Sequence, residues 1–226
     1  MRFLVTAGPT REPIDPVRYI SNRSSGKMGY AIAGAAVEAG HDVILISGPV
    51  NLARPAAAKF VSVSSSDEMF EAVQQHADES DVCVLCAAVA DYRPAKVSPL
   101  KIKKHAEKFS VELIRTRDIL DSLGHRQDRD FLLVGFAAET NDVEENAARK
   151  LREKNCDLII ANDVSGTNSA MESDVNEVTI LFRDATRQRI SRAPKKIIAR
   201  ELLKIFVNSA RKMFDKKNVM ITERIE

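Results

Sequence analysis

Short apolar runs alternate with helix-like segments through the first part of the chain. Residues 3–7 form the first run and Gly8-Pro9 ends it, which is typical of a buried strand followed by a turn. Similar runs predict further strands at residues 41–47, 59–63 and 82–88. Helices are expected between these strands, at residues 30–39 and from Ser66 or Asp67 to residue 77. Successive strand–helix–strand units favour an α/β fold with a doubly wound, mostly parallel, Rossmann-like sheet.

This alternation stops between about residues 90 and 117. The stretch shows no helical stripe and crowds charged side chains together: Asp91, Arg93, Lys96, Lys101, Lys103 and Lys104. A strand outside the main sheet is expected at residues 109–114. We interpret the segment as a protruding flap, which either covers an active site or forms a dimer arm.

Regular elements return after the flap. A short helix is expected at residues 118–123, and strands are expected at 131–136 and 157–161. Between these strands, Asn141 and Glu144 resemble a capping pair at the start of a helix that runs to Lys154.

The last part of the chain predicts the edge of the sheet and a closing helix. Residues 177–182 alternate like a half-exposed strand that pairs with residues 189–190 in an antiparallel hairpin. Pro194 is expected to open a helix to about Phe214, followed by a loosely held tail at 215–226. We therefore expect a single domain over residues 1–226.

The loop between the first strand and the first helix has the features of an anion site. It ends at Ser24-Ser25-Gly26, whose hydroxyls and backbone N–H groups lie at a helix N-terminus. Open α/β sheets bind ligands at the carboxyl ends of their strands, where this loop begins. The glycines follow neither the dinucleotide nor the Walker pattern. A phosphate site and a plain tight turn both remain possible from the spacing.

Composition narrows the class of protein. Hydrophobic residues make up 44% of the chain and charged residues 29%, which is ordinary for a globular protein. The net charge of +2 gives no reason to expect a nucleic-acid partner. Because no apolar run approaches the roughly 20 residues of a membrane span and a strand begins at once, we expect no membrane partner and a cytoplasmic location. Cys83 and Cys86 have odd spacing within a strand, so we expect core residues on opposite faces.

Five motifs in order identify a resemblance. They lie at residues 5–29, 87–93, 101–104, 135–140 and 158–164. Together they closely resemble the phosphopantothenate–cysteine ligase family, in its bacterial CTP-dependent form, which is usually the ligase domain of a bifunctional coenzyme A biosynthesis protein. The resemblance implies that a carboxylate of 4′-phosphopantothenate attacks CTP to give an acyl-cytidylate. The amine of L-cysteine then displaces CMP.

The resemblance also assigns residues to this chemistry. It implies that Asn22 and Lys101 are catalytic, with Asn22 donating to the acyl oxygen and Lys101 neutralising the triphosphate. Asp91 could hold Mg²⁺ or a polar group of the nucleotide, and Phe136 could lie against the cytosine ring. The implied CTP-binding residues are Gly8, Ser24, Ser25, Gly26, Ala87, Asp91, Asp118, Ile119, Phe136, Lys150 and Lys154. Four of the assigned residues have a structural alternative: Asn22 as a turn asparagine, Lys101 as a solvated loop lysine, Asp91 as a turn aspartate and Phe136 as a core phenylalanine.

Two groups of cations are less clearly placed. Lys150 and Lys154 fall on the same helical stripe as Leu151, either as edge lysines or as ammonium groups that meet phosphate. A helix of this length places its last turn roughly 15–20 Å from its start, away from the expected site. Arg18 is expected to bind the substrate phosphate, within one chain or across a dimer interface, or else to form a surface salt bridge.

Departures from the family pattern leave other readings open. Arg117 stands where the family usually has a proline, which changes a nucleotide-contacting turn. The decarboxylase domain does not precede the first strand, so either the ligase is stand-alone or the chain is cut from a longer one. A nucleotide sensor without catalysis and an NAD(P)-dependent oxidoreductase are the alternatives to a ligase. The uncovered basic flap predicts a homodimer.

Overall fold

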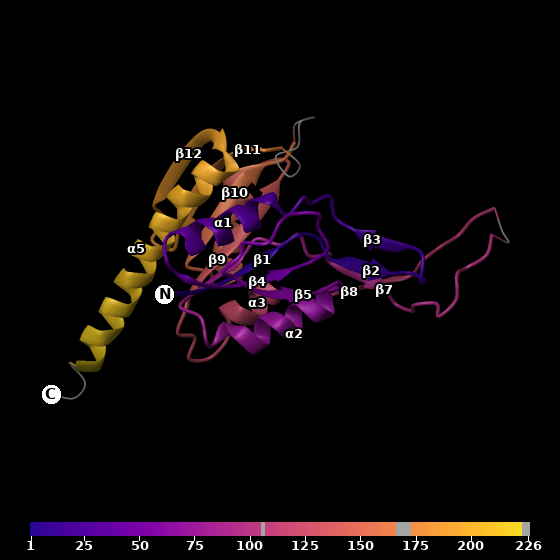
Figure 1. Cartoon of the computed structure of the whole chain (residues 1–226), viewed down its shortest axis with the longest axis horizontal. Helices are drawn as coiled ribbons and strands as arrows, with labels where there is room; N and C mark the ends of the chain where they lie inside the picture. Colours follow the sequence, from indigo (N-terminus) through magenta and orange to yellow (C-terminus); the bar gives the residue numbers. More distant parts are fainter. Residues whose placement is uncertain (105–106, 166–172, 223–226) are drawn as a thin grey trace.

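The computed structural model of the chain describes residues 1–104, 107–165 and 173–222, except for the side chains of 217–222. Within these residues, an eight-stranded sheet has the order β12-β11-β10-β9-β6-β1-β4-β5 (Figure 1). Its parallel strands are β1 (Arg2–Ala7), β4 (Asp42–Ser47), β5 (Lys59–Ser62), β6 (Val82–Leu85), β9 (Leu132–Glu139) and β10 (Leu158–Asp163). An antiparallel hairpin of β11 (Val175–Phe182) and β12 (Arg187–Pro194) forms one edge. The predicted doubly wound sheet with an edge hairpin is confirmed.

Helices cover both faces of the sheet. α1 (Lys27–Glu38) and α5 (Lys195–Thr222) pack together over one face. The other face is covered by α2 (Ser66–Ala77), α3 (Ile119–Gly124) and α4 (Val143–Glu153). Side chains alternate between the two cores along each strand, which explains why the buried strands read as continuous apolar runs.

The cysteines follow the same alternation. Cys83 belongs to the core beneath α2 and α3, whereas Cys86 packs against the core beneath α1. Burial raises the pKa of both thiols, to about 12 for Cys86. The prediction that the two side chains lie on opposite faces of the sheet is confirmed; Cys83 is buried and Cys86 is half-buried.

The order of the strands positions a crevice. From β1, the chain adds β4 and β5 on one side, and later adds β6, β9 and β10 on the other side. The carboxyl ends of β1 and β6 therefore form the switch point at which open α/β sheets bind ligands. Thr6 joins the two ends, because its Oγ1 accepts hydrogen bonds from the backbone N–H of Cys86 and of Ala87, each at 3.1 Å.

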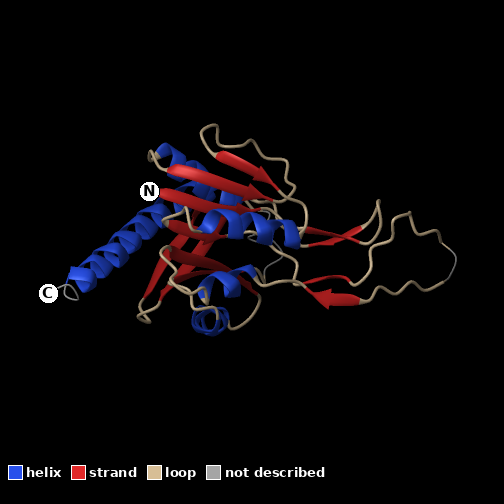
Figure 2. Cartoon of the chain, turned by 90° about the horizontal axis from the view of Figure 1, so that it is seen from below, coloured by secondary structure: helices blue, strands red, loops and turns tan. Residues whose placement is uncertain are grey.

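Two small hairpins project from this end of the molecule. β2 (Arg11–Pro13) pairs with β3 (Tyr19–Ser21), and β7 (Tyr92–Pro94) pairs with β8 (Leu113–Arg115). β2 and β7 lie side by side, and the chain between β7 and β8 extends far from the sheet (Figures 1 and 2). The strand expected at 109–114 is thus confined to Leu113–Arg115, and the protruding segment lies where the flap was predicted.

Several predicted helix ends were wrong. Ser65 rather than Ser66 or Asp67 caps α2, and its Oγ accepts from the Glu68 N–H at 3.2 Å. Asn141 and Glu144 do not cap α4, because Asp142 adopts a left-handed conformation with φ of 45° and the helix begins after it.

The closing helix also differs from its prediction. Pro194 is the last residue of β12, where it pairs with Val175, so α5 begins one residue later. α5 continues past Phe214 to Thr222, because no glycine or proline interrupts this polar sequence. Most of the predicted loose tail is therefore helical, and residues 223–226 lie outside the described residues.

Candidate nucleotide site

Two adjoining cavities occupy the carboxyl ends of β1, β6 and β9. The first, which we call the α3 cavity, has a volume of about 570 Å³ and is bounded by residues 115–121 and by α4. The second, the α1 cavity, has a volume of about 390 Å³ and is bounded by residues 22–29 and by the start of α5. They share the following lining residues: Ala87, Val89, Asp91, Phe136 and Lys150. The cavities are therefore two ends of one groove.

The glycine turn forms one wall of the α1 cavity. Gly26 has φ of 73°, and an added Cβ would lie 2.9 Å from a Val50 methyl group and 3.3 Å from the Cα of Gly8. Ser24 Oγ accepts a hydrogen bond from the Gly26 N–H at 3.3 Å. Ser24, Gly26 and Gly29 line the cavity, whereas Gly8 and Ser25 do not. Because the first N–H groups of a helix lack intrahelical acceptors, this open turn suits an anion.

Asn22 joins the turn to the floor of the groove. Its Nδ2 donates to the carbonyl oxygens of Ala88 at 3.2 Å and of Val89 at 2.9 Å. Asn22 lines the α1 cavity as predicted, but here the amide expected to meet the acyl oxygen is engaged by backbone. The role of Asn22 as a donor to the acyl oxygen remains a prediction, and it requires the side chain to give up at least one of these backbone hydrogen bonds.

Sequence reasoning missed the cations and amides at the far side of the α1 cavity. Lys27 and Lys195 line it together with Asn162 and Asn176. Lys195 is only 5% exposed, and its burial, reinforced by the positive charge of Lys27, lowers its pKa. The sequence feature that could have revealed Lys195 is the pair Lys195-Lys196 at the start of a helix, where the helix dipole disfavours cations.

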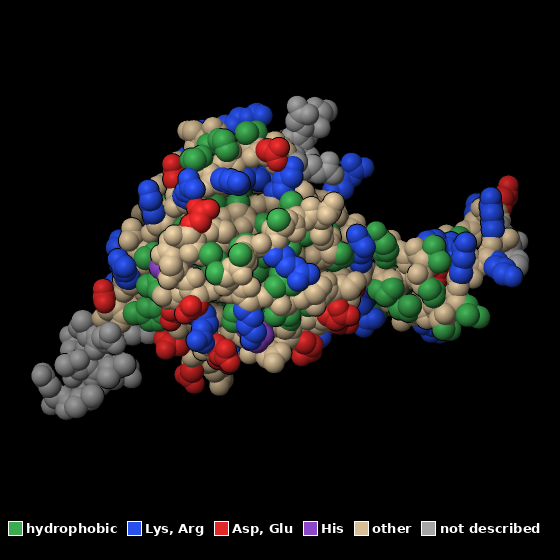
Figure 3. All heavy atoms as spheres, viewed as in Figure 1, with side chains coloured by type: hydrophobic (Ala, Val, Ile, Leu, Met, Phe, Trp, Pro, Cys, Tyr) green, Lys and Arg blue, Asp and Glu red, His purple; other side chains and the backbone are tan. Residues whose placement is uncertain are grey.

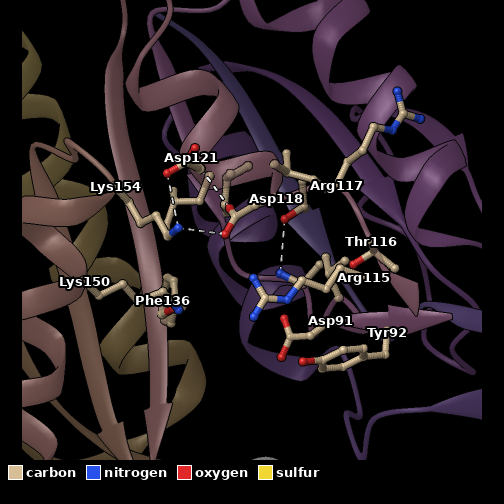
Figure 4. A pocket seen from close by; sticks show the side chains of 16 residues that line it. Asp91, Tyr92, Arg115, Thr116, Arg117, Asp118, Asp121, Phe136, Lys150 and Lys154 are labelled. Carbon is tan, nitrogen blue, oxygen red and sulfur yellow. Dashed lines mark hydrogen bonds and ion pairs between the residues drawn. The ribbon is translucent and has the colours of Figure 1, made fainter. Parts of the chain in front are cut away.

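Lysines and aspartates face one another across the α3 cavity (Figure 4). Lys154 Nζ lies 3.0 Å from Asp118 Oδ2 and 3.2 Å from Asp121 Oδ1. Burial alone would lower the pKa of Lys154, but these two carboxylates raise it above its usual range. Lys150 Nζ donates to the carbonyl oxygen of Phe136 at 2.9 Å.

The geometric objection to Lys150 and Lys154 was therefore wrong. Both side chains line the α3 cavity, although they belong to the last turn of α4 or its C-cap. Side chains on a helix lean toward its N-terminus, and α4 begins at the carboxyl edge of the sheet. The long lysine side chains thus extend back toward the start of α4 and reach the cavity, although their Cα atoms lie near the end of the helix.

The turn before α3 is fixed without the family's proline. Arg117 extends toward α2, where its Nε lies 3.1 Å from Asp67 Oδ1 and its Nη1 lies 2.6 Å from Glu71 Oε1 (Figure 4). The guanidinium also stacks over the ring of Phe70. Asp118 caps α3 through the Asp121 N–H, and both Asp118 and Ile119 line the α3 cavity as predicted.

Two expected site residues lie outside the groove of their own chain. Lys101 is an exposed residue of the flap and lines neither cavity. Arg18 forms an ion pair with Asp15 at 2.6 Å and donates to the carbonyl oxygen of Ile102 at 2.6 Å. Within one chain Arg18 has the salt bridge that we considered as the alternative, so its contact with substrate phosphate stays a prediction.

The acidic residues of the groove fit a metal ion that would take one ligand from the protein and the others from water and a bound phosphate compound. Among the described residues, no group of three or more His, Cys, Asp or Glu side chains is arranged to hold a metal ion. Asp91, at the shared border of the cavities, offers one carboxylate. One carboxylate is a common protein contribution to Mg²⁺, which takes its other ligands from water and phosphate.

Within the described residues, no helix is both long and apolar enough to cross a membrane.

Comparisons with known proteins show the family to which the chain is similar. Residues 1–210 match the family described as DNA/pantothenate metabolism flavoprotein C-terminal domain. The chain is 48% identical over 201 residues to the coenzyme A biosynthesis bifunctional protein CoaBC of Bacillus subtilis (strain 168), covering 88% of this chain and 49% of that protein. It thus spans about half the length of this curated relative.

Solved structures share the fold over nearly the whole chain. The crystal structure of the C-terminal domain of a CoaBC protein superposes with a TM-score of 0.78 at 47% identity, covering 95% of this chain and 96% of that one. A Cab2 H337A variant in complex with phosphopantothenate-cysteine superposes with a TM-score of 0.79 at 15% identity, covering 96% of this chain and 88% of that one. The second similarity concerns the fold alone.

Proposed function

Because the chain belongs to the DNA/pantothenate metabolism flavoprotein C-terminal domain family, we propose that it catalyses the CTP-dependent ligation of 4′-phosphopantothenate to L-cysteine in coenzyme A biosynthesis. The observation that carries the proposal is one groove with two different ends. Its α3 end, up to the border with the α1 cavity, offers Phe136 and backbone to a nucleoside, and its α1 end offers a glycine turn and cations to phosphates.

The reaction proceeds in two transfers. The pantothenate carboxylate attacks the α-phosphorus of CTP, and the bond from that phosphorus to the bridging oxygen breaks. Pyrophosphate leaves with the electron pair, and an acyl-cytidylate remains. The amine of cysteine then attacks the acyl carbon, CMP leaves, and loss of one proton from nitrogen completes the amide.

The residues of the groove act by positioning and by charge. Phe136 supports the cytosine ring, and backbone groups at Ala87 to Val89 read its edge, which makes CTP the nucleotide. Lys150 and Lys154 lie beside the ribose and phosphates. Asp91 would hold Mg²⁺, which neutralises phosphate charge when bound. Asn22 donates to the acyl oxygen as negative charge develops there, a contribution worth roughly 2.7–4 kcal/mol in comparable oxyanion sites.

A second copy of the chain supplies what one groove lacks. Lys101 and Arg18 both lie on the projecting part of the molecule, where a partner's groove can receive them. We therefore include a homodimer in the proposal, with Lys101 neutralising the triphosphate and Arg18 binding the phosphate of phosphopantothenate.

A product assay tests the function directly. The protein is incubated with CTP, Mg²⁺, phosphopantothenate and cysteine, and pyrophosphate and 4′-phosphopantothenoylcysteine are measured. Pyrophosphate release that requires phosphopantothenate supports the ligase. Binding of CTP without turnover would instead indicate a sensor, and reduction of a nicotinamide cofactor would indicate an oxidoreductase.

The Asn22→Asp variant tests the role of Asn22, because it replaces the amide by a carboxylate of nearly the same size. We expect it to keep CTP binding and to lose amide formation by about 100-fold or more, because a donor becomes a negative acceptor. The carboxylate would also face the carbonyls of Ala88 and Val89, so the thermal unfolding midpoint is measured in parallel. Unchanged product formation by this variant would remove the role of Asn22.

A further inference from the structure

The α1 cavity reaches across the sheet from the glycine turn after β1 to Asn162 on β10 and Asn176 on β11. We propose that these two asparagines bind an α-amino acid, the L-cysteine of the proposed reaction. Both amide nitrogens donate to its carboxylate, and the Asn162 side-chain oxygen accepts from its amine. The inference rests on the proposed function, which supplies the acyl-cytidylate, but it is argued from the two amides themselves.

The position of Asn162 on β10 brings it to the cavity. Ile160 packs in the core beneath α1 and α5, and side chains alternate along a strand, so Asn162 lies on that same face of the sheet. It pairs in register with Ala138 of β9, an exposed small residue that also lines the cavity. Asn162 belongs to the segment 158–164, the one motif of the five to which the proposed function assigns no residue.

The two amides are buried, yet they keep groups that can bond to a ligand. Asn162 is 9% exposed and Asn176 is 6% exposed. Asn176 Oδ1 accepts from the Glu177 N–H at 3.0 Å, which orients the amide and leaves its Nδ2 hydrogens as donors. Within the described parts of the chain, no hydrogen bond engages the Asn162 side chain. Because a buried amide without partners costs free energy, both residues indicate a polar ligand in the cavity.

The donors and the acceptor of this pair match an α-amino acid. A carboxylate only accepts hydrogen bonds, so it suits the Nδ2 groups of both asparagines. The amine, one carbon away from the carboxylate, donates to Asn162 Oδ1. A side-chain amide carries its oxygen and its nitrogen on one carbon, so Asn162 can hold both groups of the same amino acid. Hydrogen bonds to a charged carboxylate are also stronger than those to a neutral group.

The other substrate groups have other places in the proposed complex. The nucleoside lies against Phe136, the phosphates lie at the glycine turn, and the acyl carbon lies at Asn22. Phosphopantothenate extends from the acyl carbon toward Arg18 of a second copy. The wall formed by Asn162 and Asn176 is the part of the α1 cavity that these groups leave, and it belongs to the same cavity as Asn22. Cysteine is the substrate that remains for it.

The asparagines orient cysteine and take no proton. The bond from the amine nitrogen to the acyl carbon forms, and the bond from that carbon to the phosphate oxygen of CMP breaks with its electron pair. Nitrogen then loses one proton to water. An amide oxygen serves only as a hydrogen-bond acceptor here, so Asn162 acts by holding the amine in place.

Substitution by aspartate tests the contact with the carboxylate. Asn162→Asp and Asn176→Asp keep an acceptor oxygen and replace the donor by a negative charge, which repels a carboxylate. With pre-formed acyl-cytidylate, we expect each variant to lower kcat/KM for cysteine by about tenfold or more. We expect no such loss with cysteamine, which has the same amine and thiol but no carboxylate. Asn208→Asp, on the exposed face of α5, is the control and should match the wild-type protein with both amines.

The same kinetics can overturn the inference. An unchanged kcat/KM for cysteine in Asn162→Asp and Asn176→Asp would remove the amino-acid site. Equal losses with cysteine and with cysteamine would show that the two amides do not bind the carboxylate. A raised KM for phosphopantothenate in place of cysteine would assign the asparagines to the pantothenate chain, and this result would also reject the inference.

A measurement on the wild-type protein covers the case of a variant that fails to fold. In heteronuclear NMR with CMP and phosphopantothenate present, cysteine should shift the side-chain amide signals of Asn162 and Asn176, and cysteamine should leave the Asn176 signals in place. Absence of any shift with cysteine would overturn the inference. If cysteine shifts both sets of signals but the protein forms no pyrophosphate from CTP and phosphopantothenate, the proposed function fails and the amino-acid site stands.

Discussion

Asp15 joins two separate parts of the projecting end through a single carboxylate. It accepts hydrogen bonds from the N–H groups of Val17 at 2.8 Å, Arg18 at 2.9 Å and Ile102 at 3.1 Å. The Arg18 guanidinium adds an ion pair at 2.6 Å. Burial alone would raise the pKa of Asp15, but these donors hold the pKa well below its usual range. One residue therefore ties the β2–β3 hairpin to the flap.

Asp15→Asn should loosen this connection. We expect the amide hydrogen of Ile102 to exchange about tenfold faster at neutral pH, because the neutral amide is a weaker acceptor. The carboxylate's contribution to the free energy of unfolding is complete above its ordinary pKa of 3.8. It is lost as the pH falls through the lowered pKa, so the stability difference between wild type and variant should shrink in acid.

Hydrogen exchange and urea unfolding at several pH values check this prediction. Asp184→Asn is the control, because the Asp184 carboxylate accepts hydrogen bonds from the N–H and the hydroxyl of nearby Thr186 in the β11–β12 turn. It should leave exchange at Ile102 unchanged. A stability difference that grows toward acid would contradict the assignment to Asp15.

At the scale of elements, α1 presses its first turn against β1. A Cβ added at Gly29 would lie 2.7 Å from the Ala7 Cβ and 2.9 Å from the Thr6 carbonyl oxygen, whereas one added at Gly34 meets nothing within 4 Å. Backbone cannot yield as a flexible side chain can. The first turn of α1, which lines the α1 cavity, therefore packs directly against the end of β1.

Gly29→Ala and Gly34→Ala therefore have opposite expected effects. Gly29→Ala should lower the free energy of unfolding by about 1–3 kcal/mol through overpacking, and it should also weaken CTP binding. Gly34→Ala should raise the free energy by up to about 1 kcal/mol, because alanine favours a helix. Denaturant titration of both variants measures the difference. Destabilisation by Gly34→Ala and not by Gly29→Ala would show that α1 sits elsewhere.

Elements with one dominant pattern could be predicted from the sequence. The buried strands are short apolar runs between turns, so their positions and the parallel sheet follow from periodicity. Helix ends depend on single conformations such as the left-handed Asp142, which the pattern of polar residues does not determine. The capping pair at Asn141 failed for this reason, whereas the predicted helix end at Phe214 failed because no glycine or proline stops α5 there.

The candidate site was predictable only where residues share a motif. Asn22, Asp91 and Phe136 lie in motifs near strand ends, and the fold brings them to one groove. Lys195 lies far along the chain, and its contribution comes from α5 starting beside α1, which local sequence does not encode. Lys150 and Lys154 were placed too far away because the helix axis, rather than side-chain direction, was considered.

At the scale of the whole molecule, apolar side chains gather on the projecting end (Figure 3). The exposed ones in this region include Val17, Tyr19, Tyr92, Val97, Leu100, Phe109, Leu113 and Ile114. Contiguous exposed apolar side chains mark interaction surfaces more often than free surface. This arrangement supports the proposed homodimer.

Leu100→Asp should disrupt that dimer. Leu100 is 76% exposed, and burial of an aspartate in an apolar interface is unfavourable. Light scattering at micromolar concentration should show a dimer for the wild type and a monomer for the variant, with loss of ligase activity because Lys101 no longer reaches a partner. Ile197→Asp, on α5, is the control and should remain dimeric. A monomeric wild type would contradict the dimer.

The junction between groove and flap has a mechanical consequence. Asp91 lines both cavities and the next residue, Tyr92, begins β7, so no spacer separates the floor of the groove from the arm that projects from it. Thr116 clamps the returning chain to the Ala90 carbonyl oxygen at 2.7 Å. The β7–β8 hairpin is thus attached directly to the floor of the groove at both of its strands. A displacement of the β7–β8 hairpin would therefore move the part of the groove lining that carries Asp91.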